Sequence, residues 1–218
     1  MLMHVVAWSV IGLVLGGWAC IRARRDIVHQ RQRGVTFGEA HFAHTSVAVV
    51  LSSAIGAVLL YVFAQRDLPD VVIASFAYVV SSGLRLSLVD IDTHTIPHRL
   101  LFRSTAMLFL LVVVSAILTH DIAFGGALLG AVIMWCVMKV LEVLSRGDLG
   151  PADVSFAAYL GLFVGGVDLA LVPTALAAAF ISGGLIALVL LVIRRAGRKT
   201  HLPFGPFLFC GALVAVLR

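Results

Sequence analysis

The chain has 218 residues, of which 61% are hydrophobic and only 12% are charged, and its mean hydropathy is +1.08. A soluble domain averages about 45–50% apolar and about 25% charged residues, so this composition excludes a soluble protein and predicts an integral membrane protein. The net charge of +5 is not arranged as a basic stripe with interleaved aromatic residues, so we expect no nucleic-acid partner.

Apolar runs along the chain predict an all-α fold, a polytopic bundle of about eight transmembrane helices in a single domain, 1–218. The expected spans are 5–21, 45–65, 70–89, 100–119, 122–144, 154–171, 173–193 and 203–217. Several are shorter than the roughly 20 residues that a perpendicular span needs. Small residues in the fifth and sixth runs are expected to let helices approach closely. They are Gly125, Gly126, Gly130, Gly161, Gly165 and Gly166.

The distribution of basic residues predicts the topology. No positive residue precedes the first run and a basic cluster follows it, so we expect a retained helix rather than a cleaved signal. With eight spans, 14 of the 16 Lys and Arg residues fall on one side, five of them in a predicted basic loop at 22–44. Positive charge marks the cytoplasmic side, so both termini are expected outside. Asp90, Asp92 and Asp153 then face the cytoplasm.

Acidic residues at the edge of an apolar run are candidates for function, because a charge near the bilayer is costly. Asp90 and Asp92 lie one residue apart at the end of the third run, and Asp153 precedes the sixth. Two carboxylates held close together cannot both ionise easily, so one keeps a proton. Such a pair can activate water against an amide and protonate the leaving nitrogen. Spacing alone leaves this as a general hypothesis.

Three ordered motifs make the hypothesis more specific. In the first, Asp90 is followed seven residues later by Pro97 and soon afterwards by Leu100. The second reads Leu-Gly-Pro-Ala-Asp-Val at 149–154, and the third contains Pro-Phe-Gly-Pro at 203–206. Together, over roughly 85–211, these motifs resemble the type IV prepilin peptidases, which are GxGD-type intramembrane aspartyl proteases.

The resemblance implies an aspartic-type endopeptidase of the bacterial cytoplasmic membrane. It would cleave the basic leader peptide of type IV pilin-like precursors at the cytoplasmic face and would require no metal or organic cofactor. Asp90 and Asp153 would be catalytic. The substrate-binding or supporting residues would be Asp92, Pro97, Gly150, Pro203, Phe204, Gly205 and Pro206. We interpret Asp92 as a solvated residue capping its turn, the alternative being a partner of the catalytic pair.

The second motif departs from the family pattern. The third residue of GxGD is Ala152 here, and the Lys often found two residues after the acid is Ser155. Ala can replace Gly where the backbone needs no positive φ. A competing placement on Asp148 keeps Gly-Asp but loses the first Gly. We prefer Asp153 because Gly161 follows it by eight residues, as in the family.

The family's long form carries a zinc-binding insert with two C-x-x-C pairs and a methyltransferase activity. Segment 22–44 contains no cysteine, and Cys20, Cys136 and Cys210 form no C-x-x-C pair. The chain therefore resembles the short, peptidase-only branch that serves Flp/Tad-type pili. Two other functions remain open, a catalytically degenerate pilus-assembly factor and a small transporter. The key acids of a transporter are expected near the bilayer midplane.

Overall fold

The computed structural model describes residues 2–32, 34, 42–66, 68–119, 121–145, 149–193 and 203–218. All regular secondary structure within these residues is helical, which confirms the predicted all-α class. The chain forms two compact units, Met1–Phe124 and Gly125–Arg218, and each is described by itself.

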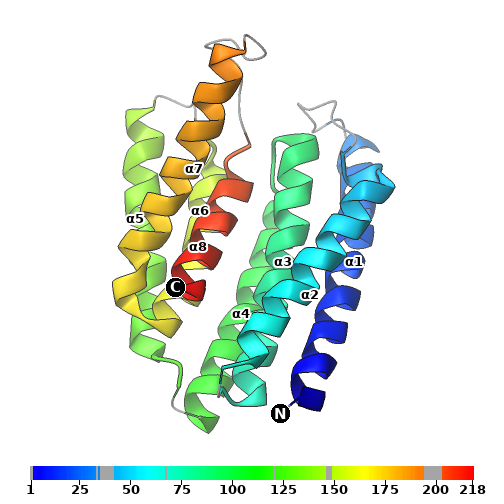
Figure 1. Cartoon of the computed structure of the whole chain (residues 1–218). Coiled ribbons are helices and arrows are strands. Elements are labelled where there is room, and N and C mark those ends of the chain that lie inside the picture. The colour runs from blue at the N-terminus through cyan, green and yellow to red at the C-terminus, as the bar shows by residue number, and fades with distance from the viewer. Residues whose placement is uncertain are drawn as a thin grey trace. The chain divides into compact units, whose positions relative to one another are not determined.

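The first unit contains four long helices and one short turn of helix. They are α1 (Leu2–Gln32), η1 (Phe42–His44), α2 (Ser46–Ala64), α3 (Asp70–Thr93) and α4 (His98–Leu118). Helix α3 packs against α1, α2 and α4. Successive helices alternate in direction, so α1 and α3 end where α2 and α4 begin (Figure 1). We call this the motif end of the first unit, because Asp90 and Pro97 lie there.

The second unit repeats the alternation of direction. It comprises α5 (Phe124–Leu144), α6 (Pro151–Val167), η2 (Leu169–Leu171), α7 (Val172–Val192) and α8 (Gly205–Leu217). Helices α5 and α7 run toward the end of this unit from which α6 and α8 start, and α7 extends past the start of α8 (Figure 1). The second and third sequence motifs therefore lie at the same end of this unit.

Each predicted span corresponds to a helix in the described part of the chain. Helices α1 to α5 and the segment Leu169–Val192 are long and apolar enough to cross a membrane. The remaining two, α6 with 17 residues and α8 with 13, are shorter apolar helices. The polytopic helical bundle predicted from composition is thus confirmed.

The first helix is longer than predicted. We expected it to end near residue 21 and a basic loop to occupy 22–44, but α1 continues to Gln32. The physical reason is that its buried face continues at helical spacing through Ala19, Ala23 and Ile27, each fully buried. The basic residues of 22–32 therefore lie on a helix, where Arg is a favourable residue.

Glycines set the close packing of α5 against α6. A Cβ added at Gly161 would collide with the carbonyl of Gly130, and one added at Gly165 would collide with the carbonyl of Gly126. This contact confirms the predicted role of these four glycines. The prediction is wrong for Gly125, which has open space where a Cβ would lie.

Candidate active site

Asp90 lies in the last turns of α3 and is buried, with 4% of its surface exposed. The helix was expected to end at residue 89 but continues to Thr93, so both acids of the first motif are helical. The backbone carbonyl of Asp90 accepts a hydrogen bond from the N–H of His94 at 2.8 Å. The helix end therefore fixes the backbone of the first candidate catalytic acid.

Asp92 is fully buried, which corrects its interpretation as a solvated residue. Its two carboxylate oxygens accept hydrogen bonds from the backbone N–H groups of Phe42 and Ala43, each at 3.0 Å. These donors lie fifty residues away in the chain, so no local pattern could reveal them. Asp92 joins the end of α3 to the segment that precedes α2.

The turn between α3 and α4 holds an unusual backbone conformation. His94 caps α3 with φ of 51°, and it is the only non-glycine residue with positive φ among the described residues. A left-handed residue with a side chain is strained by roughly 1–2 kcal/mol, and such strain often marks functional sites. Pro97 is the N-cap of α4, so the turn ends directly before the next helix begins.

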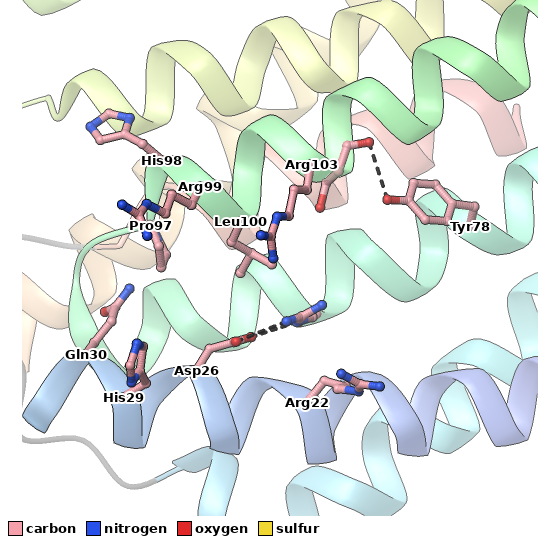
Figure 2. A pocket seen from close by; sticks show the side chains of 12 residues that line it. Arg22, Asp26, His29, Gln30, Tyr78, Pro97, His98, Arg99, Leu100 and Arg103 are labelled. Atoms are coloured by element: carbon pink, nitrogen blue, oxygen red, sulfur yellow. Dashed lines mark hydrogen bonds and ion pairs between the residues drawn. The ribbon is translucent and has the colours of Figure 1, made fainter.

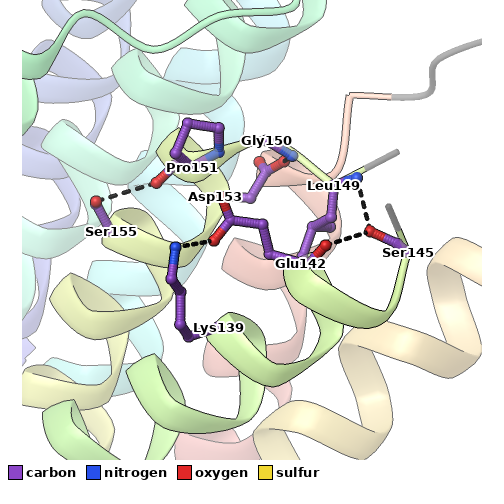
Figure 3. A network of polar contacts seen from close by, with 8 residues as sticks. All are labelled: Lys139, Glu142, Ser145, Leu149, Gly150, Pro151, Asp153 and Ser155. Carbon is purple, nitrogen blue, oxygen red and sulfur yellow. Dashed lines mark hydrogen bonds and ion pairs between the residues drawn. The ribbon is translucent and has the colours of Figure 1, made fainter. Parts of the chain in front are cut away.

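Asp153 lies in the first turn of α6, ahead of the apolar span expected from residue 154 (Figure 3). Its Oδ2 accepts a hydrogen bond from the N–H of Gly150 at 3.3 Å. Burial raises the pKa of the Asp153 carboxyl to about 6, against the smaller lowering effect of this N–H donor. A carboxyl in this environment keeps a proton at pH values where an exposed Asp is ionised.

The backbone around Asp153 accommodates the departures from the family motif. Gly150 is extended, with φ of −78° and ψ of 148°, and Ala152 lies within the helix. Neither conformation requires glycine, so the condition for Ala at the GxGD position is met. Ser155 donates a hydrogen bond from its hydroxyl to the carbonyl of Pro151 at 3.1 Å, so its side chain contacts the backbone of the first turn of α6.

Polar contacts tie the end of α5 to the start of α6 (Figure 3). Lys139 pairs with Glu142 at 2.6 Å, and the hydroxyl of Ser145 donates to the carbonyl of Glu142 at 3.0 Å. The same hydroxyl accepts from the N–H of Leu149 at 3.2 Å. Asp148, the competing candidate, lies outside the described residues.

The third motif opens α8. Phe204 is the N-cap of this helix, Gly205 is buried at its first position, and Pro206 follows in the first turn. The ring of Phe204 packs against Phe180 of α7, with ring centroids 5.4 Å apart. The motif therefore joins α7 to α8 at the end of the second unit that also carries Gly150 and Asp153. Pro203 directly precedes this start.

The structure thus brings the predicted site residues together in two groups. Asp90, Asp92 and Pro97 share the motif end of the first unit. Gly150, Asp153 and the Pro-Phe-Gly-Pro segment at 203–206 share one end of the second. The pairing of Asp90 with Asp153 joins the two units and stays a prediction.

Sequence reasoning missed an ion pair beside the first group. Arg85 of α3 donates to both carboxylate oxygens of Asp26 of α1, at 2.7 and 3.0 Å (Figure 2). Each side chain is about three-quarters buried. The available signal was that Asp26 is the only acidic residue in the basic run 22–33.

Comparison with known proteins gives a consistent result. Residues 77–188 match the family described as the type IV leader peptidase family. A "Prepilin leader peptidase/N-methyltransferase" of Pseudomonas putida is 27% identical over 137 residues, and one of Stutzerimonas stutzeri is 25% identical over 138 residues. These alignments cover 62% of this chain and 46% of each relative, so the chain spans about half their length. No solved structure matches.

Proposed function

From the premise that the chain belongs to the type IV leader peptidase family, we propose that it is an aspartic-type endopeptidase that removes leader peptides from pilin-like precursors. The observation that carries this proposal is the environment of two acids within the matched segment. Asp90 is 4% exposed at the end of α3, and Asp153 is partly buried at the start of α6, where burial raises its pKa.

In the proposed mechanism Asp90 and Asp153 share one proton. The ionised carboxylate takes a proton from water as the water oxygen attacks the scissile carbonyl, and the protonated carboxyl donates to the leaving nitrogen. Together the two steps cleave one amide bond and restore the shared proton. The two carboxyl groups would titrate as a coupled pair, so the starting ionised form is not assigned to one residue.

The environment of Asp153 supports its role as the proton-holding member. With a pKa of about 6, this carboxyl is half protonated near pH 6. A second carboxylate brought close would raise the pKa further, because two like charges repel. One shared proton would then persist toward neutral pH.

The charge distribution of the first unit supports an active site at the cytoplasmic face. Arg22, Arg24, Arg25 and Arg31 of α1 lie toward its motif end, as do Arg99 and Arg103 of α4. Arg66 follows α2 at the opposite end. By the positive-inside rule the motif end faces the cytoplasm. We place the protein in a bacterial inner membrane, with both termini outside and a single peptidase domain.

The proposed substrates are Flp/Tad-type pilin-like precursors, whose apolar helix would stay in the bilayer while the basic leader lies in the cytoplasm. Asp92, Pro97, Gly150 and the segment 203–206 would support the site by fixing the helix ends that carry the two acids. The proposed reaction needs no metal or organic cofactor.

A cleavage assay tests the proposal. The chain is co-expressed with a pilin-like precursor from the same genome, and the processed fraction is compared for wild type, Asp90→Asn and Asp153→Asn. Removing either acid should slow cleavage by roughly 10²–10⁴-fold or more. Asp121→Asn is the matched control, because Asp121 is exposed in the loop between α4 and α5. Its processing should equal that of wild type.

Two other results of this assay would change the assigned catalytic residue or the assigned function. If Asp148→Asn abolishes cleavage while Asp153→Asn does not, the second acid is Asp148 and the protease stands. If wild-type protein inserts stably yet cleaves no plausible precursor, the degenerate assembly factor becomes the better function. The departures Ala152 and Ser155 are the features that keep this second function open.

A further inference from the structure

A basic cavity lies within the first unit, separate from the two candidate catalytic acids. Its volume is about 550 Å³, and α1, α3 and α4 line it (Figure 2). Arg22 and His29 project from α1, while Arg99 and Arg103 project from α4 and Arg85 from α3. Three helices thus direct guanidinium groups toward one space.

The cavity keeps a surplus of positive charge after its internal ion pair is counted. Asp26 is the only acidic residue among the lining residues, and both its oxygens are occupied by Arg85. None of the ion pairs among the described residues includes Arg99 or Arg103. Like charges that line one cavity repel one another, so an anion bound among them would be stabilised.

The position of the cavity along α1 indicates the depth at which it lies in a bilayer. A helix rises 1.5 Å per residue, so about 20 residues cross a hydrocarbon core of about 30 Å. The apolar part of α1 ends at Ile21 and its basic residues start at Arg22, so Arg22 lies near the level where headgroups begin. The 31-residue length of the helix leaves its last third beyond the core.

Aromatic residues near the cavity also indicate that it lies at the level of the lipid headgroups. Arg22 lies over the ring of Trp18 at 4.8 Å, and Trp at the membrane boundary is typical of spanning helices. On α4, Phe102 is 75% exposed between the basic residues Arg99 and Arg103. Exposed apolar rings next to the basic lining residues on the same helices match a phospholipid, which carries an anionic headgroup beside acyl chains.

We propose that this cavity binds a phosphate group, supplied by the headgroup of an anionic phospholipid. Arg99 and Arg103 of α4 and Arg22 of α1 would hold the phosphate oxygens by charge-assisted hydrogen bonds. The Asp26–Arg85 pair forms one wall of the cavity and orients Arg85. Phe102 and Trp18 lie beside acyl chains. Neither Asp90 nor Asp153 lines this cavity.

The test is lipid retention by the full chain in detergent. Purified protein is mixed with phosphatidylglycerol or phosphatidylcholine, and bound lipid is counted by native mass spectrometry. The test variant is Arg99→Gln/Arg103→Gln. The control is Arg25→Gln/Arg218→Gln, which removes the same charge from exposed positions outside the cavity. Inorganic phosphate and a glutamate-rich peptide are added as competitors, and far-UV circular dichroism checks that each variant is helical.

Wild type and control should retain phosphatidylglycerol over phosphatidylcholine, and the test variant should lose this preference by on the order of tenfold. If inorganic phosphate alone binds, and this binding also requires Arg99 and Arg103, the phosphate site stands with a free anion as its source. Equal retention by test and control variants would overturn the proposal. Binding of the acidic peptide without binding of either phosphate source would also overturn it, because the cavity would then recognise carboxylates.

Discussion

Asp92 in the first unit is fully buried and Asp153 in the second is partly buried, and their hydrogen bonds differ. Asp92 is fully buried and accepts two backbone N–H groups at 3.0 Å, one on each oxygen. Asp153 accepts one backbone N–H at 3.3 Å. The first carboxylate has donors that replace the water it has lost, whereas the second has less compensation for its burial.

The difference separates an anchoring acid from a reactive one. A carboxylate that accepts backbone N–H groups from a distant segment holds that segment against its own helix. A buried carboxyl with few donors tends to keep its proton and is suited to acid–base chemistry. The acid nearest in sequence to Asp90 is therefore the structural one, and the acid from another motif is the chemical candidate.

The largest effect on stability is expected at the anchor. Asp92→Ala leaves the N–H groups of Phe42 and Ala43 without acceptors in a buried place, which should lower the free energy of unfolding by about 2–5 kcal/mol. Thermal unfolding in detergent measures the loss. A melting temperature equal to that of wild type would contradict the anchoring role of Asp92.

Substitution of the proposed reactive acid, Asp153, is expected to raise the free energy of unfolding instead of lowering it. Since the pKa of Asp153 is raised to about 6, its contribution to stability is present below about pH 4 and is lost as pH rises through 6. Asn mimics the neutral carboxyl, so Asp153→Asn should raise the free energy of unfolding by about 1–3 kcal/mol at pH 8. Melting temperatures of both proteins at pH 4 and pH 8 check this. The gain should vanish at pH 4, and destabilisation at pH 8 would show that Asp153 is structural.

A smaller effect is expected from the ion pair beside the basic cavity. Asp26→Asn removes the charge that Arg85 contacts, and this partly buried pair should contribute about 1 kcal/mol. A double-mutant cycle with Arg85→Gln measures the coupling between the two side chains. Additive losses in the cycle would mean that the pair contributes no interaction energy.

The smallest effect is expected at the departure from GxGD. Ala152→Gly restores the family residue inside the first turn of α6, where glycine should lower the free energy of unfolding by about 0.5–1 kcal/mol. The cleavage rate should change less than about threefold, since no positive φ is needed there. A rate increase of tenfold would show that Ala152 impairs the enzyme.

Local patterns in the sequence were enough to predict each of the eight α-helices among the described residues, because polar residues, glycine or proline separate the apolar runs. The missed extension of α1 was readable in the spacing of Ala19, Ala23 and Ile27, which continues into the basic run. The partners of Asp92 were not readable, because a buried carboxylate and its backbone donors can be fifty residues apart. The ordered motifs predicted the environment of Asp153 only as far as its place at a helix start.

The central claim is that Asp90 and Asp153 act as one catalytic unit, and a double-mutant cycle on single-turnover cleavage tests it most directly. Residues that act together lose activity non-additively, so a double variant is no slower than the more damaging single variant. We predict that Asp90→Asn, Asp153→Asn and the double variant cleave a pilin-like precursor at similarly low rates while remaining folded. Losses that multiply in the double variant, or either single variant cleaving at the wild-type rate, would contradict the shared-proton pair.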